Sequence, residues 1–191
     1  MYNIDKIKYS LQARLSSKRY EHTLGVEYTC CALAMRYGAD MQQARMAGLL
    51  HDCAKHYSGE RLVEKCIQYE LSISEYEKAF PELLHAKVGA YLAREKYGVE
   101  DKEIINAIEC HTTGKPDMTI LEKILYIADY MEPNRDRAPH LATIRELAFS
   151  DLDACLLKIL SGTLYYLKSK GSVIDPQTEA TYEFYNNSKA L

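Results

Sequence analysis

The chain has 191 residues and a formal net charge of −3, with 47% hydrophobic and 27% charged residues. This is the composition of a globular protein that can bury a core without disulfides, and the small negative charge excludes a general attraction to nucleic acid or to an anionic membrane. The six cysteines show no CxxC spacing, the start lacks a signal-peptide pattern and no apolar stretch approaches the ~20 residues of a membrane span, so a reduced, cytoplasmic protein is expected.

Apolar residues recur at helical spacing along nearly the whole chain, without alternating strand patterns. The expected helices cover about 4–15, 19–37, 40–51, 59–70, 82–97, 102–111, 120–131, 140–149, 152–170 and 176–186. Glycine and proline residues separate them, as at Gly38 and Pro139. The predicted fold class is all-α, with one domain over 1–191, a core at about 19–135 and C-terminal helices at 140–188 packed on it.

Side chains that can bind metal lie within or next to several of these apolar segments. They are His22, His51, Asp52, His85, His111 and Asp129. Asp129 is the most informative, because a carboxylate in so apolar a helix should be buried and an unpaired buried charge is costly. No lysine or arginine lies nearby on the same helix face before Arg135, so a divalent metal is a good candidate for the compensating charge.

Taken singly, these residues are most often structural, as hydrogen-bonded core residues, caps or ion-pair partners. The set is more specific: one histidine, a His-Asp pair about 30 residues later, and a distant aspartate in an apolar helix. This pattern resembles the H…HD…D signature of the HD-domain metal phosphohydrolases. Phosphate-loop, dinucleotide-loop and HExxH motifs are absent from the sequence.

The resemblance extends to the YqeK-type branch, the symmetrical bis(5′-nucleosyl)-tetraphosphatases. The segments that carry it are RYEHT at 19–23, LLHDCAK at 49–55, LHA at 84–86, HTTG at 111–114 and IADYMEPNR at 127–135, with KGSVID at 170–175 as a later match. It implies an HD-type helical bundle with a metal near its centre. It also implies metal-dependent hydrolysis of diadenosine tetraphosphate to two ADP.

By this resemblance His22, His51, Asp52 and Asp129 hold one metal. Two imidazoles and two carboxylates suit iron, the first choice, or manganese or cobalt. His85 and His111 have two interpretations: they contact phosphate, or they bind a second metal that Asp52 bridges. The expected catalytic residues are Asp52, Lys55, His85 and His111.

The resemblance also implies a set of nucleotide contacts. They are Arg19, His22, Asp52, Cys53, Ala54, Lys55, His85, His111, Thr112, Asp129, Arg135, Lys170, Gly171, Ser172, Val173, Ile174 and Asp175. Lys55 is expected one turn after Asp52 on the same helix face, where it can reach a phosphate held at the metal. Arg135 follows the helix of Asp129, and its guanidinium fork suits phosphate.

Other functions stay open at this point. Another HD phosphohydrolase, such as a 5′-nucleotidase or an alarmone hydrolase, would use the same ligands, as would a di-iron oxygenase of the HD type. A nucleotide-sensing module with a degenerate site is the non-enzymatic alternative, although the HD pair and Asp129 are both retained. The expected partner is a small nucleotide, without nucleic acid or membrane, and a homodimer is an open alternative.

Overall fold

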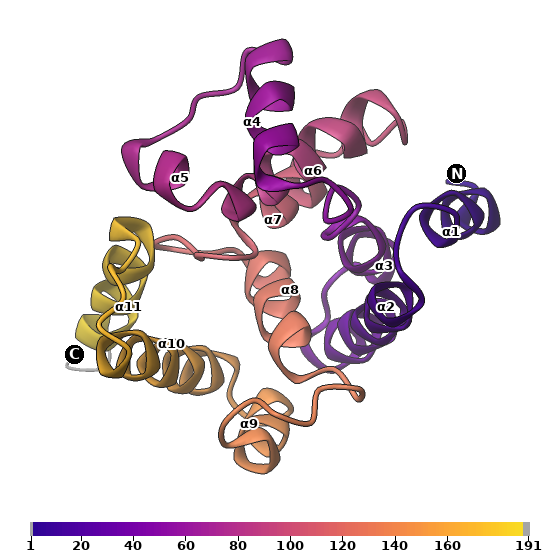
Figure 1. Ribbon diagram of the computed structural model, residues 1–191. Coiled ribbons are helices and arrows are strands. Elements are labelled where there is room, and N and C mark those ends of the chain that lie inside the picture. The colour runs from indigo at the N-terminus through magenta and orange to yellow at the C-terminus, as the bar shows by residue number, and fades with distance from the viewer. Residues whose placement is uncertain (1, 189–191) are drawn as a thin grey trace.

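The computed structural model describes residues 2–188; residue 1 and residues 189–191 of the expected domain lie outside the described residues. Within this range every regular element is a helix, which confirms the predicted all-α class. The helices are α1 (Ile4–Gln12), α2 (Ser17–Tyr37), α3 (Met41–Leu50), α4 (Gly59–Gln68), α5 (Glu75–Ala79), the 3₁₀ helix η1 (Pro81–Leu84), α6 (His85–Glu95), α7 (Lys102–Cys110), α8 (Ile120–Met131), α9 (Leu141–Ala148), α10 (Leu152–Ser169) and α11 (Pro176–Ser188) (Figure 1).

Local side chains set the ends of the helices that carry the site. The Asp40 carboxylate accepts the backbone N–H groups of Gln42 and Gln43 at the start of α3, and Thr119 forms a capping box with Glu122 at the start of α8. Gly38 ends α2 in the left-handed conformation, with φ of 68°. These signals are local in sequence, so the boundaries of these helices match the predicted ones closely.

The segment before α6 differs from the prediction of one helix over 82–97. A 3₁₀ turn precedes α6, which begins at His85, and the short helix α5 comes before it. Helix α5 starts at a capping box of Ser74 and Glu77, but five residues are too few to produce an apolar period. The sequence pattern therefore concealed this helix.

The prediction that Lys55 lies one helical turn after Asp52 was wrong. Helix α3 ends at Leu50, and the chain continues through tight turns in which the Lys55 N–H donates to the Asp52 carbonyl at 2.9 Å. A hydrogen bond between residues three apart closes a tighter turn than an α-helix. Lys55 and Asp52 are therefore neighbours through this turn and do not share a helix face.

Helix α8 lies at the centre of the arrangement (Figure 1) and packs against α2, α3, α7 and α10. Its apolar residues Ile124, Leu125 and Ile127 are fully buried. Helices α2 and α3 approach closely because Gly48 has no side chain: a Cβ there would lie 2.9 Å from the Cα of Glu27. This packing brings the ends of α2, α3 and α8 to one place.

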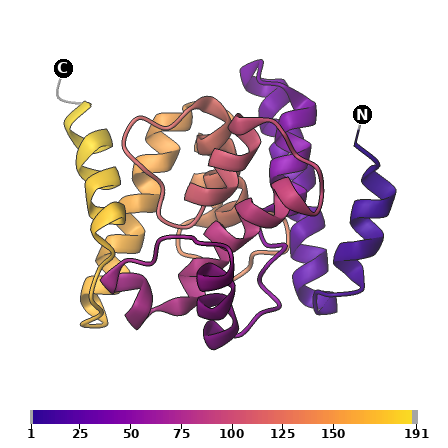
Figure 2. The same cartoon turned by 90° about the horizontal axis from the view of Figure 1, so that it is seen from above.

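Helices α10 and α11 pack on each other, and α10 packs on α8. Figure 2 shows α11 and α1 on opposite sides of the molecule. None of the described helices is long and apolar enough to cross a membrane.

Candidate metal centre

Six side chains that could bind a metal, from five parts of the chain, meet at the junction of α2, α3, α6, α7 and α8. His22 comes from α2, His51 and Asp52 directly follow α3, His85 begins α6, His111 directly follows α7, and Asp129 lies in the last turn of α8. All four histidines and Asp52 are at most 7% exposed. The structure thus brings together all six residues that the sequence singled out.

Asp52 is the centre of this group. Its Oδ2 atom lies 3.4 Å from His51 Nε2 and 3.8 Å from His22 Nε2. Its Oδ1 atom lies 3.2 Å from His85 Nε2 and 3.9 Å from His111 Nε2. The two oxygens of one carboxylate therefore face two different pairs of imidazoles.

The second ring nitrogen of each histidine is already occupied. In three rings Nδ1 contacts a backbone carbonyl three residues earlier: Gly48 for His51 at 2.8 Å, Glu82 for His85 at 2.5 Å and Ile108 for His111 at 2.7 Å. In His22, Nδ1 contacts Glu132 Oε1 at 3.1 Å. Because a carbonyl can only accept a hydrogen bond, Nδ1 carries the proton in His51, His85 and His111, and their Nε2 atoms keep the lone pair. The four Nε2 atoms are therefore turned towards Asp52 as potential ligands.

The donor set fits a divalent cation. His22 Nε2 and His51 Nε2 are buried without a hydrogen-bond partner among the described residues, which is uncommon for buried polar atoms. The ligand atoms of His22, His51 and Asp129 lie within 4.8 Å of one another, as do those of His51, Asp52 and His111. Imidazole nitrogens with carboxylate oxygens are typical ligands of iron, manganese and cobalt.

The pKa shifts in the centre follow from the close approach of buried histidines and carboxylates. Burial raises the pKa of the Asp52 carboxyl, but His51 and His85 outweigh it and hold that pKa well below its usual range. Burial, with the nearby His85 and His51 rings, lowers the pKa of His111 to about 3. Burial lowers the pKa of His51, but the Asp52 and Asp129 carboxylates outweigh it and raise that pKa. A metal ion would therefore compete with a proton at His51, because a ligand imidazole must be neutral.

Asp129 is less buried than the sequence predicted, because its side chain is 24% exposed. It lies in the last turn of α8, just before the loop that carries Arg135. Arg135 Nη2 lies 2.9 Å from Asp129 Oδ1, and Arg19 Nη1 lies 2.7 Å from Asp52 Oδ2. Asp129 therefore stands where the centre opens to solvent.

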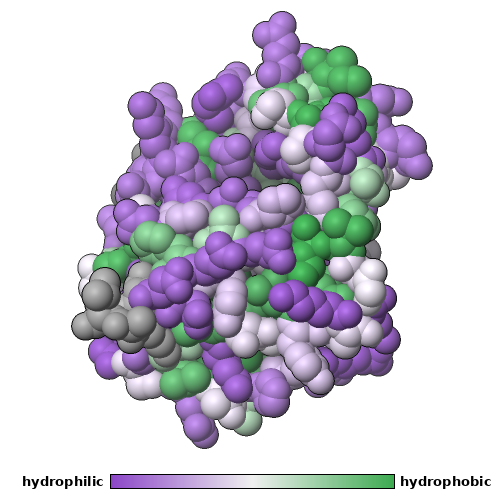
Figure 3. Space-filling view, turned by 90° about the vertical axis from the view of Figure 1, so that its left-hand side faces the viewer, coloured by the Kyte–Doolittle hydropathy of each residue, from purple (hydrophilic) through white to green (hydrophobic). Residues whose placement is uncertain are grey.

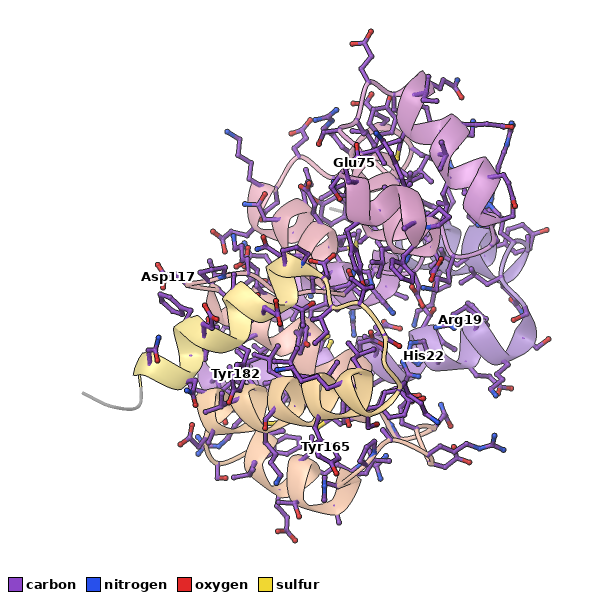
Figure 4. All side chains as sticks on the ribbon, turned by 60° about the vertical axis from the view of Figure 1, so that its left-hand side comes forward. Arg19, His22, Glu75, Asp117, Tyr165 and Tyr182 are labelled. Carbon is purple, nitrogen blue, oxygen red and sulfur yellow. The ribbon has the colours of Figure 1, made fainter. Side chains whose placement is uncertain are left out.

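Arg19, Lys55 and Arg135 form a cationic rim around this opening. The Lys55 Nζ lies 3.1 Å from His85 Nδ1 and 3.3 Å from Nε2, so the ammonium stands over the ring. Burial lowers the pKa of Lys55, and the nearby Asp52 carboxylate opposes that effect. Figure 4 shows Arg19 and His22 near the same end of α2. Three cationic side chains thus border Asp52 and Asp129.

The remaining predicted nucleotide contacts lie in three other places. Cys53 and Ala54 follow Asp52 and lie in the core, 2% and 0% exposed. Thr112 and Asp175 line a cavity beside the centre. Residues 170–173 lie exposed in the connection between α10 and α11, and Ile174 is half-buried. The substrate roles of these residues stay predictions.

Glu132 is a residue of the centre that the sequence analysis did not single out. It is 1% exposed, and its carboxylate accepts from His22 Nδ1 and, at 2.7 Å, from the backbone N–H of Asn134. A Cβ on Gly25 would lie 2.2 Å from Glu132 Oε2, so only glycine leaves room for this carboxylate beside α2. The signal in the sequence was an acidic residue directly after the helix of Asp129.

Arg145 is a second missed residue. Its guanidinium donates to the carbonyl groups of Met131, Glu132 and Arg135 at 2.9–3.0 Å. These bonds fix the turn that places Glu132 and Arg135 at the centre. An arginine in an amphipathic helix carries no sequence signal for such a role.

Replacing Glu132 with glutamine should weaken metal binding about 10- to 100-fold, the range found when an outer partner of a metal-binding histidine is removed. Glutamine keeps the shape but removes the negative charge that makes His22 a better ligand. The measurement is the metal dissociation constant by chelator competition, with the exposed Glu146→Gln variant as the matched control. An unchanged constant would show that Glu132 only fills space.

An all-helical bundle with a centre of histidines and aspartates, bordered by three cationic side chains, has the features of helical metal-dependent phosphohydrolases. The HD domain family model matches residues 19–134, and the chain belongs to that family. Three relatives bear the name symmetrical bis(5′-nucleosyl)-tetraphosphatase. The protein of Halalkalibacterium halodurans is 41% identical over 90% of this chain and 91% of its own, that of Bacillus subtilis 40% over 91% and 92%, and that of Staphylococcus aureus 35% over 97% and 96%.

A solved structure supports the same assignment. The crystal structure of a Clostridium acetobutylicum protein, described as a predicted HD superfamily hydrolase involved in NAD metabolism, superposes with a TM-score of 0.94 at 38% sequence identity. The superposition covers 98% of this chain and 99% of the other. The fold is therefore shared over essentially the full length.

Proposed function

We propose that this chain is a symmetrical bis(5′-nucleosyl)-tetraphosphatase that hydrolyses diadenosine tetraphosphate to two ADP in the cytoplasm. The observation that carries the proposal is the centre on Asp52, where four imidazole Nε2 atoms and Asp129 surround one carboxylate beside a cationic rim. Such a centre suits a cation together with a chain of phosphates. The names of the three relatives point to the same substrate class.

The proposed metal is a single iron ion held by His22, His51, Asp52 and Asp129, with His85 and His111 directed to the phosphate. A divalent cation in such a site lowers the pKa of bound water and polarises a phosphoryl oxygen. Metal analysis of the purified protein tests this. One equivalent of iron per chain is expected; two equivalents would assign His85 and His111 to a second cation.

The cationic rim is proposed to bind the polyphosphate. Arg19 contacts Asp52 through one guanidinium nitrogen, whereas Arg135 contacts Asp129 through two, with Nε donating to the backbone carbonyl and Nη2 to the carboxylate. A guanidinium has five N–H donors, so each arginine keeps donors that can face a phosphate. The Lys55 ammonium adds a charge above His85. These groups stabilise the charge that develops on the phosphoryl group and on the leaving oxygen.

The position of the cut gives a direct test. If residues 170–175 hold one nucleoside and the rim holds its two phosphates, water should attack the second phosphorus from that nucleoside in every substrate. Diadenosine tetraphosphate should give two ADP, and the pentaphosphate should give ADP and ATP. Chromatography of early products, with ¹⁸O-labelled water marking the attacked phosphate, makes the measurement. ATP and AMP from the tetraphosphate would contradict the symmetrical assignment.

A substrate panel separates the other HD activities. Nucleoside monophosphates and alarmones are expected to react far more slowly than diadenosine tetraphosphate. The monophosphates lack the second phosphorus at which the cut is proposed, and alarmones with two separate diphosphates lack a third phosphate beyond it. Preferred hydrolysis of either would instead define a nucleotidase or an alarmone hydrolase.

A further inference from the structure

Three basic side chains, Arg14, His56 and Lys96, come from three segments that meet beside α1. Arg14 lies two residues after α1, His56 lies in the tight turns after α3, and Lys96 directly follows α6. The positive charges of Arg14 and Lys96 act on His56, and that of Arg14 acts on Lys96, so the three groups are neighbours. They are called the basic cluster below.

The segments that carry the basic cluster are joined by direct contacts. The hydroxyl groups of Ser10 and Tyr97 lie 3.3 Å apart, which joins α1 to the end of α6. The Cys53 thiol donates to the Gly89 carbonyl at 3.6 Å, which joins the turns after α3 to α6. The Lys96 ammonium lies 4.9 Å from the centre of the Tyr97 ring, beside the side chain that contacts α1. The packing of the three segments therefore holds the basic cluster together.

The basic cluster has no acidic counterpart. Neither Arg14 nor Lys96 has an ion pair or a side-chain hydrogen bond among residues 2–188. In the described part of the chain, no carboxylate is among the charges that act on His56 or Lys96. Like charges held close together repel one another. A chain with a net charge of −3 thus keeps one group of positive charges without compensation.

His56 gives the basic cluster a ring with unused hydrogen-bonding capacity. The ring is half-buried and packs on Tyr57, with 4.0 Å between the ring centroids. Its Nδ1 atom is buried and forms no hydrogen bond within the described range, which is uncommon for a buried polar atom. The Cys53 carbonyl is the one backbone acceptor that acts on the ring, while burial and the charges of Arg14 and Lys96 lower the pKa of His56. A protonated imidazole has two N–H donors, so at least one is left for an anion.

The basic cluster is separate from the metal centre and from the predicted nucleotide contacts. Lys55 and His56 are consecutive, but the Lys55 ammonium contacts His85 at 3.1 Å, whereas His56 faces the charges of Arg14 and Lys96. Helices α1 and α11 lie on opposite sides of the molecule (Figure 2). Residues 170–175 precede α11, on the side where hydrophilic side chains surround apolar ones (Figure 3).

We propose that the basic cluster is an anion site that binds a phosphate group outside the metal centre. Arg14 and Lys96 supply charge-assisted hydrogen bonds to the phosphate oxygens, and His56 supplies a third from the turns after α3. The bound dianion offsets the repulsion among the three cations. Free inorganic phosphate and the terminal phosphate of a nucleoside monophosphate both present this group. The inference does not rest on the proposed function.

The test is equilibrium dialysis of ³²P-labelled inorganic phosphate with the metal-loaded protein in saturating ADP, which fills the proposed substrate site. The wild type should bind one further phosphate per chain. Arg14→Ala/Lys96→Ala should bind it at least tenfold more weakly, because hydrogen bonds to charged groups are among the strong ones. Both side chains are exposed, so the fold should persist. Lys6→Ala/Lys102→Ala removes the same charge from two other exposed positions and should bind phosphate as the wild type does.

Equal phosphate affinity in Arg14→Ala/Lys96→Ala and in the wild type would overturn the proposal. An equal loss in Lys6→Ala/Lys102→Ala would overturn it as well, because binding would then follow net charge alone. Labelled adenosine 5′-monophosphate in place of phosphate distinguishes the two sources of the ligand. Comparable affinity, lost in the cluster variant, assigns the site to free phosphate, and binding at least tenfold tighter, lost in the same variant, assigns it to a nucleotide.

Discussion

Replacement of Asp52 by asparagine is expected to remove the bound metal and, with it, hydrolysis of the phosphate chain. Both oxygens of this carboxylate face imidazole nitrogens, so one substitution withdraws the charge at the middle of the centre. Loss of an outer partner of a ligand costs about 10- to 100-fold in affinity, and loss of the central ligand should cost more. Asparagine keeps the shape of the side chain, so the fold should persist.

Two measurements on the same samples check this result: metal content after dialysis, and the rate with saturating substrate. Asp136→Asn is the matched control, because its carboxylate is 82% exposed and lies in the loop next to Arg135. Full metal occupancy in Asp52→Asn would mean that the histidines and Asp129 suffice, and the central role of Asp52 would be wrong.

Removal of the Lys55 ammonium or the Arg135 guanidinium should slow turnover about 10²- to 10³-fold, the cost of losing one preorganised group that stabilises developing charge. Metal binding should be retained in both alanine variants. In Arg135→Ala the metal should bind at least as tightly as in the wild type, because a cation 2.9 Å from Asp129 is removed.

Arg137→Ala is the control for these variants, since the Arg137 side chain is 94% exposed. Near wild-type rates in Lys55→Ala and Arg135→Ala would make both residues ordinary surface charges. If these variants lose metal as well as rate, Lys55 and Arg135 support the metal centre and do not act on the phosphates.

Part of the centre could be predicted from the sequence because several of its residues are marked by local contrast. His51 and Asp52 interrupt an apolar run, and Asp129 is a charge inside the most apolar helix. Helices that carry such residues bury their apolar faces against one another, and this packing brings the polar side chains next to those faces together. All-helical architecture followed from the same periodicity.

The geometry around the ligands could not be predicted, because it depends on contacts between distant segments. Glu132 reaches His22 across 110 positions of sequence, through a gap that exists only because residue 25 is glycine. The exposure of Asp129 depends on where α8 ends against the following loop. The expected place of Lys55 was wrong because no residue type marks the change from helix to tight turns after Leu50.

The basic cluster was equally hidden, since its members come from three separate segments. In the sequence Arg14, His56 and Lys96 each look like ordinary solvated residues. Their common position arises from the contacts that join α6 to α1 and to the turns after α3.

The bonds from Nδ1 to the backbone carbonyls have a consequence for how the protein acquires its metal. His51, His85 and His111 are each oriented by a carbonyl three residues earlier, within their own turn. Local folding alone therefore sets the orientation of these imidazole rings. We therefore expect little ordering of the chain to accompany capture of a metal ion, unlike in zinc fingers, where binding and folding are one event. Removal of the metal by a chelator should then leave the helical fold in place, and a circular dichroism spectrum recorded before and after chelation checks this expectation.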